Sequence, residues 1–320
     1  MKFALLCFVG LMVTTASAGS RPAAKVSEAA EMQKEYRDFL SRVAHEKSDP
    51  QHNPTFLFHA RETKRVALVI PGSFESPAHF RTMANYFYRT KGINTLSVSL
   101  PGFWTKDLKD VTSVQYAQWV EYLEHTMSFL SQIGDEVVIY GHSLGGLLAI
   151  YLASRYPDTV KMVFTSSPAI STTGIIKVLS SMDQLGAKVG IKLNGKLPRA
   201  NGVDVPLQSG NISSQITKFA EAKGIWPATE DFLAKYKTPT FAISPANDLV
   251  VSTKKVKAFF AKLSSPKKII ILDKKKGVTH RSMMKAKIDL CLNIKEVCWK
   301  EFDLEAAFKE VDAFYNLHGG

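Results

Sequence analysis

Cysteine is scarce in this chain. Its 320 residues hold only three, Cys7, Cys291 and Cys298. So few cysteines exclude a small scaffold held together by several disulfides. The motifs that bind zinc, such as CxxC and HExxH, are absent, and the histidines show no metal-ligand spacing. The sequence therefore contains no motif for a metal centre.

Two further absences narrow the possible functions. After residue 20 no apolar run is long enough to span a bilayer. The net charge is +12, but no nucleic-acid motif and no interleaving of basic and aromatic residues accompanies it, so we expect no nucleic-acid partner. Residues 190–196 have the spacing of a phosphate-binding loop, yet Leu197 stands where Ser or Thr is required and no strand precedes it.

The first residues resemble a secretory signal. Lys2 precedes an apolar run at residues 3–13, and Ala16-Ser17-Ala18 is typical of a cleavage site. We expect residues 1–18 to be removed after Ala18 and the protein to be exported, to the periplasm or out of the cell; a short uncleaved anchor is the alternative. In an exported protein Cys291 and Cys298 are expected to form a disulfide, with two buried thiols as the alternative.

Lysines are concentrated between residues 254 and 276. A basic surface of this kind suits peripheral contact with anionic lipid headgroups. The simpler interpretation is a solvated lysine-rich face.

Strands and helices alternate along most of the chain. The composition is 45% hydrophobic and 22% charged, which is typical of a globular domain. The predicted strands are residues 66–70, 94–100, 137–140, 160–165, 240–244 and 268–272, with helices at 27–46, 77–90 and 113–133, after Ser143, around 256–263 and at 304–314. This alternation predicts an α/β fold, a doubly wound and mostly parallel sheet, as one domain over residues 19–320. We also expect residues 55–59 to form a hairpin with residues 65–70.

Residues 171–237 interrupt this alternation. They hold helical segments near 175–185 and 216–222 and a glycine-rich middle. Because the segment is inserted between two core strands, we expect it to form a helical lid over the edge of the sheet; an insertion without a role is the alternative. Asn211-Ile212-Ser213 is a glycosylation sequon, relevant only in a eukaryotic host.

The chemistry is indicated by Gly141-His142-Ser143-Leu144-Gly145. An apolar strand precedes this motif and a helix follows it without a loop, which is the context of a nucleophile elbow. The glycines permit a turn too tight for neighbouring Cβ atoms. Ser143 is therefore the predicted nucleophile, and a chance match to a short pattern is the alternative.

A serine hydroxyl needs a base, and the base needs a group that orients it. Asp248 follows the strand at 240–244, and His280 follows the strand at 268–272. Carboxyl ends of parallel strands share one rim of the sheet, so we expect both side chains near Ser143. Asp273, at the end of the last strand, is the rival to Asp248.

Backbone amides are expected to bind the oxyanion. The N–H of Leu144 starts the helix behind the nucleophile, and the N–H of Ser73 lies in the loop after the first core strand, with Phe74 as the second choice. Phe74, Phe103 and Trp104 are candidates to line an acyl pocket. For Phe103 and Trp104, plain packing is an equal alternative.

From Val66 to Leu317 the chain resembles the α/β-hydrolase superfamily, in particular its monoacylglycerol-lipase-like and small carboxylesterase branch. The resemblance rests on Gly-His-Ser-Leu-Gly-Gly at 141–146, Pro-Ala-Asn-Asp-Leu-Val-Val at 245–251 and the loop of His280. It implies hydrolysis of small acyl esters through an acyl-enzyme, with no cofactor and with a lid that binds acyl chains. The chain departs from the family at Pro71, where the family has His, at Gly277, which is not adjacent to His280, and at 281–300, which is longer.

Other functions share this machinery. A serine peptidase or aminopeptidase, a thioesterase, an acyltransferase or a cofactor-free perhydrolase would use the same residues, and a catalytically silent binding protein would keep the fold.

Overall fold

A computed structural model describes residues 29–43, 49–59, 63–105, 107, 109–173, 199–200, 203–273, 280 and 304–319. The predicted signal peptide, Cys291 and Cys298, the helical segment at 175–185 and Gly277 all lie outside these residues. In the described part of the chain, no helix combines the length and apolar character needed to cross a bilayer.

The core is a seven-stranded sheet in the order β1-β3-β2-β4-β5-β8-β9. Its strands are β1 (Thr55–Leu57), β2 (Arg65–Ile70), β3 (Asn94–Ser97), β4 (Glu136–His142), β5 (Val160–Ser166), β8 (Thr240–Pro245) and β9 (Lys267–Leu272). Every neighbouring pair is parallel except β1 and β3. The predicted α/β fold with a mostly parallel sheet is therefore confirmed.

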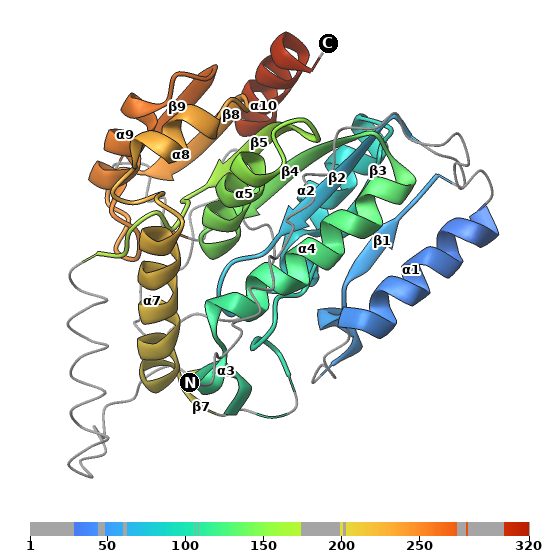
Figure 1. Cartoon of the computed structure of the whole chain (residues 1–320), viewed down its shortest axis with the longest axis horizontal. Coiled ribbons are helices and arrows are strands. Elements are labelled where there is room, and N and C mark those ends of the chain that lie inside the picture. The colour runs from blue at the N-terminus through green and yellow to red at the C-terminus, as the bar shows by residue number, and fades with distance from the viewer. Residues whose placement is uncertain are drawn as a thin grey trace, which may run out of the picture.

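Helices cover both faces of the sheet (Figure 1). One core cluster joins alternate residues of β2, such as Val66 and Leu68, to α4 (Tyr116–Ile133), α5 (Leu144–Arg155) and α9 (Thr253–Lys262). The other cluster joins Ala67 and Val69 to the segment after β2 and to α10 (Leu304–His318). Alternation along a strand sends successive side chains to opposite faces, so a continuously apolar strand needs cover on both.

Residues 77–90 are helical, as predicted, but not one regular helix. They form a 3-10 turn η2 (Pro77–Phe80), α2 (Arg81–Asn85) and a π-helical turn η3 (Tyr86–Thr90). Gly92 follows with φ 65°, in the left-handed region, and ends the segment. The long helix expected at 113–133 is α4, which begins at Tyr116, and a separate short helix, α3 (Lys109–Ser113), precedes it.

The expected hairpin between residues 55–59 and 65–70 is wrong. β1 pairs antiparallel with β3, with Phe56 opposite Leu96. Both edges of β2 are occupied by the parallel strands β3 and β4, so the outer edge of β3 is the position open to β1. Beside β1 lies α1 (Ala29–Val43), which packs on α4 (Figure 1).

The insertion between β5 and β8 contains a short β6–β7 ribbon (Arg199–Ala200 with Val203–Asp204), α7 (Val205–Ala222) and α8 (Glu230–Lys235). The helix expected at 216–222 is therefore longer than predicted. α7 lies against α3 and α4, and the Asn211 side chain donates hydrogen bonds to the carbonyl groups of Val111 and Val114. The sequon asparagine is thus engaged in helix packing. Whether the insertion acts as a lid stays a prediction.

Candidate active site

Ser143 lies in the turn between β4 and α5, with φ 52° and ψ −116°. The turn is tight on both sides: a Cβ at Gly141 would lie 2.2 Å from the Gly145 carbonyl oxygen, and a Cβ at Gly145 would lie 2.0 Å from that of Ile70. Only glycine fits at these two positions. The Ser143 backbone is secured by its N–H, which donates to the Ser166 carbonyl at 3.0 Å. The strand–turn–helix predicted around Ser143 is present.

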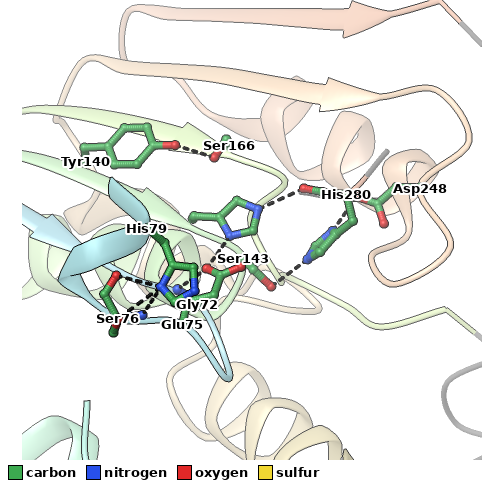
Figure 2. Close-up of polar contacts among 10 residues, drawn as sticks. Gly72, Glu75, Ser76, His79, Tyr140, Ser143, Ser166, Asp248 and His280 are labelled. Atoms are coloured by element: carbon green, nitrogen blue, oxygen red, sulfur yellow. Dashed lines mark hydrogen bonds and ion pairs between the residues drawn. The ribbon is translucent and has the colours of Figure 1, made fainter. Parts of the chain in front are cut away.

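His280 and Asp248 meet Ser143 at the carboxyl ends of the strands (Figure 2). His280 Nε2 lies 2.9 Å from Ser143 Oγ, and His280 Nδ1 lies 2.7 Å from Asp248 Oδ2. The other carboxylate oxygen, Oδ1, accepts from the backbone N–H groups of Val250 and Val251. The two hydrogen bonds to Oδ1 hold the carboxylate in position, and the three predicted side chains form one continuous chain.

The rival carboxylate, Asp273, is exposed at the end of β9, whereas the Asp248 side chain is fully buried. Burial opposes ionisation of Asp248. The hydrogen bond and charge of His280, together with the two amides, outweigh burial and hold the pKa of Asp248 below its ordinary value. Asp248 is therefore an ionised acceptor at neutral pH.

Burial lowers the pKa of His280 below its ordinary value, and the Asp248 carboxylate offsets only part of this effect. The imidazole is then neutral at pH 7. With Nδ1–H directed at Asp248, its Nε2 lone pair faces the Ser143 hydroxyl. A neutral imidazole in this tautomer is what a general base requires.

The two predicted oxyanion donors belong to segments that touch Ser143. Leu144 is the first residue of α5, so its N–H has no acceptor within the helix. Ser73 follows Gly72, where a Cβ would lie 2.9 Å from Ser143 Cβ. The Ser73 hydroxyl is also buried, without a hydrogen-bond partner among the described residues.

The three aromatic candidates for an acyl pocket differ in position. Phe103 is fully buried and stacks on Trp119. Its position therefore fits core packing, the alternative that the sequence left open. Phe74 is partly buried and packs edge-on against Phe103. Trp104 stacks on His52 at 3.9 Å between ring centroids. Phe74 and Trp104 both have positive φ, 60° and 57°, which is uncommon for large side chains.

Sequence reasoning missed two residues beside Ser143. His142 Nδ1 lies 2.7 Å from Glu75 Oε2, and His142 Nε2 lies 2.9 Å from the His280 carbonyl oxygen. His142 stood in the elbow motif, but nothing in the sequence paired it with a glutamate 67 positions earlier. The described residues contain no cluster of His, Cys, Asp and Glu arranged to hold a metal ion.

A parallel sheet that positions a serine elbow, a histidine and an aspartate on one rim defines an α/β hydrolase. A family model described as serine aminopeptidase, S33, matches residues 61–282. The chain belongs to this hydrolase family.

Relatives agree with this assignment. The chain is 25% identical to a thermostable monoacylglycerol lipase of Bacillus sp. (strain H-257) over 142 residues, 44% of this chain and 51% of the relative. The match thus spans about half the length of that relative.

Solved structures share the fold. One from a study of LipS and LipT, two metagenome-derived lipolytic enzymes, has a TM-score of 0.60 at 18% identity and covers 84% of this chain and 99% of its own. A soluble variant of the Saccharomyces cerevisiae monoglyceride lipase, solved with a substrate analog, has a TM-score of 0.59 at 16% identity, with coverages of 86% and 95%. Est1E of Butyrivibrio proteoclasticus, with ferulic acid bound, has a TM-score of 0.55 at 17% identity, with coverages of 83% and 94%.

Proposed function

We propose that the protein is a serine hydrolase that cleaves carboxylic esters through an acyl-enzyme. The observation that carries this proposal is the chain of hydrogen bonds from Ser143 through His280 to Asp248, built on a strained elbow. A serine hydroxyl aligned with a neutral imidazole, which a buried carboxylate orients, is an activated nucleophile.

The reaction follows from this geometry. Ser143 Oγ attacks the ester carbonyl carbon while His280 Nε2 takes its proton, and Asp248 stabilises the imidazolium that forms. The N–H groups of Leu144 and Ser73 bind the oxyanion; each such donor contributes on the order of 3 kcal/mol to the transition state. His280 then protonates the departing alcohol, and water, activated by the same imidazole, releases the acid and restores Ser143.

The proposed substrates are monoacylglycerols or other small acyl esters. Support comes from the monoacylglycerol lipase relative and from the partly buried Phe74 beside the predicted oxyanion loop. An aminopeptidase is the second candidate, because the matching family is described by that activity. Export after cleavage near Ala18, and contact of the basic chain with a lipid surface, are part of the same proposal.

The test is a panel of p-nitrophenyl esters of rising acyl length, assayed beside aminoacyl amides, with a fluorophosphonate probe on wild type and Ser143→Ala. We expect ester cleavage that favours medium chains, labelling of the wild type, and a loss of on the order of 10⁵-fold or more in kcat for the variant. Faster cleavage of amides than of esters would move the assignment to an aminopeptidase. A wild type that neither labels nor turns over any substrate would favour a silent binding protein.

A further inference from the structure

A second buried acid–histidine pair lies directly behind the nucleophile. The His142 side chain is fully buried and that of Glu75 is 2% exposed. Glu75 Oε2 lies 2.7 Å from His142 Nδ1 and also accepts the Gly72 N–H at 2.7 Å. The opposite ring nitrogen, His142 Nε2, lies 2.9 Å from the carbonyl oxygen of His280. One carboxylate oxygen and one imidazole thus connect three segments.

The acceptors around His142 determine where its proton lies. A carbonyl oxygen only accepts, so Nε2 must carry a hydrogen and donate it to His280. The remaining proton is shared between Nδ1 and Glu75, as imidazolium with carboxylate or as neutral imidazole with carboxylic acid. In both states the bond to the His280 carbonyl is made, and in both the buried pair has no net charge, which makes its burial tolerable.

The three connected segments are the three parts of the proposed catalytic site. Gly72 and Glu75 flank Ser73 in the oxyanion loop, His142 precedes Ser143, and His280 is the base. His280 lies beyond Leu272, where β9 ends, so no strand ladder holds its backbone. The hydrogen bond from His142 secures that backbone to β4, a central strand of the sheet.

We propose that Glu75 and His142 are positioning residues, which fix the His280 backbone and the oxyanion loop against the elbow so that the imidazole stays aligned between Ser143 and Asp248. The proposal rests on the proposed esterase function. Neither residue touches the reacting atoms; they act through His280 and Ser73. Misplacement of a base by about 1 Å costs on the order of 10²-fold in rate, so loss of this support lowers kcat more than it changes KM.

Two amide substitutions at His142 separate its two bonds. In His142→Gln the amide nitrogen reaches the position of Nε2 and keeps the bond to the His280 carbonyl. In His142→Asn the shorter amide reaches only Glu75, and the His280 carbonyl loses its donor. We expect kcat for p-nitrophenyl ester hydrolysis to fall about 10- to 100-fold in His142→Asn and less than about 5-fold in His142→Gln, with KM within about 3-fold in both.

Glu75→Gln tests the other end of the network. One oxygen serves both Gly72 and His142, and an amide provides only one suitable atom there. Either the Gly72 N–H loses its acceptor, or the histidine stays charged beside a neutral partner. We expect kcat to fall by about 10-fold or more, with little change in KM.

Tyr236→Phe is the matched control, since it removes a buried hydrogen bond between the hydroxyl groups of Tyr236, directly after α8, and Thr240, the first residue of β8, away from the site. It should lower the melting temperature without lowering kcat. Equal kcat values in His142→Asn and His142→Gln would overturn the proposal. A crystal structure of His142→Asn tests the positioning role without any measurement of turnover: an unmoved His280 would contradict that role. Absence of esterase activity in the wild type is a different result, and it would refute the proposed function only.

Discussion

At the scale of single residues, Ser143 holds a backbone conformation that its Cβ disfavours. A φ of 52° with ψ −116° costs a residue with a side chain about 1–3 kcal/mol. The hydrogen bonds of the Ser143 N–H and carbonyl, and the two glycines beside it, hold the turn in place. The strained conformation places the Ser143 Oγ clear of the strand and toward His280.

This strain predicts different stabilities for two inactive variants. Ser143→Ala keeps the Cβ and its strain. Ser143→Gly removes the strain, but the greater entropy of its unfolded chain lowers its free energy of unfolding by about 0.5–1 kcal/mol. We expect Ser143→Gly to exceed Ser143→Ala in free energy of unfolding by about 1 kcal/mol, measured by urea denaturation. An alanine variant more stable than the glycine variant by about 0.5–1 kcal/mol, the entropy difference alone, would show that the elbow stores no such strain.

The environment of His280 predicts the pH dependence of activity. Only the neutral imidazole accepts the Ser143 proton, so kcat/KM falls as the pH drops through the pKa of His280. Burial lowers that pKa, and the acid limb should therefore have its midpoint below about pH 6.5, the value of an unperturbed histidine. The measurement is kcat/KM for a p-nitrophenyl ester from pH 4 to 9. A midpoint above pH 7 would argue against a desolvated base.

The sequence was sufficient to propose Ser143, Asp248 and His280 because each follows a recognisable strand, and strands of a parallel sheet end on one rim. It was not sufficient for Glu75 and His142. Their pairing depends on how the loop after β2 folds back over the elbow, and no periodicity encodes that contact. The burial of Phe103 against Trp119 is likewise a result of tertiary packing.

At the scale of elements, α7 is attached to the sheet domain by polar side chains as well as apolar ones. The Asn211 amide caps two carbonyl groups at the end of α3, and the Gln215 side-chain oxygen accepts the Tyr116 N–H at the start of α4. These bonds satisfy helix ends that would otherwise be unpaired. They hold α7 against α3 and α4.

Substitution of Asn211 tests this attachment. Asn211→Ala removes both hydrogen bonds, and we expect a loss of about 1–2 kcal/mol in free energy of unfolding. Asn211→Asp preserves the size but directs an acceptor at two carbonyl oxygens, so it should be at least as destabilising at neutral pH. Thermal and urea unfolding of the two variants provides the comparison. Wild-type stability in Asn211→Asp would mean that the two hydrogen bonds of Asn211 do not help to hold α7.

The elements themselves were largely predictable, since apolar runs and helical spacing are local properties. The partner of β1 was not. Adjacent apolar strands with a polar turn between them favour a hairpin, but competition for the edges of β2 is decided by strands far along the chain.

At the scale of the whole molecule, α1 and β1 lie outside the residues that the family model matches. The family match begins at residue 61, whereas these elements lie within residues 29–57. They add an antiparallel edge strand and a helix that covers α4 through a cluster of aromatic side chains. The rings of Phe39 and Phe129 stack at 5.1 Å, and Tyr36 packs on Phe56 at 5.3 Å.

This cluster lies on α4 and the edge of the sheet, not on the rim where Ser143, Asp248 and His280 meet. The cluster should therefore contribute to stability and not to catalysis.

Phe39 is 3% exposed, so Phe39→Ala leaves a cavity between α1 and α4. We expect this variant to lower the free energy of unfolding by about 3–4 kcal/mol while kcat stays within about 2-fold. Tyr36→Phe is the matched control: it keeps the ring and loses only the hydrogen bond from the Tyr36 hydroxyl to the Pro54 carbonyl, which predicts a loss of about 1 kcal/mol. Urea unfolding and ester hydrolysis below the unfolding transition measure both quantities. A fall in kcat that parallels the loss of stability in Phe39→Ala would show that the N-terminal elements reach the site through α4, and the division between support and chemistry would then be wrong.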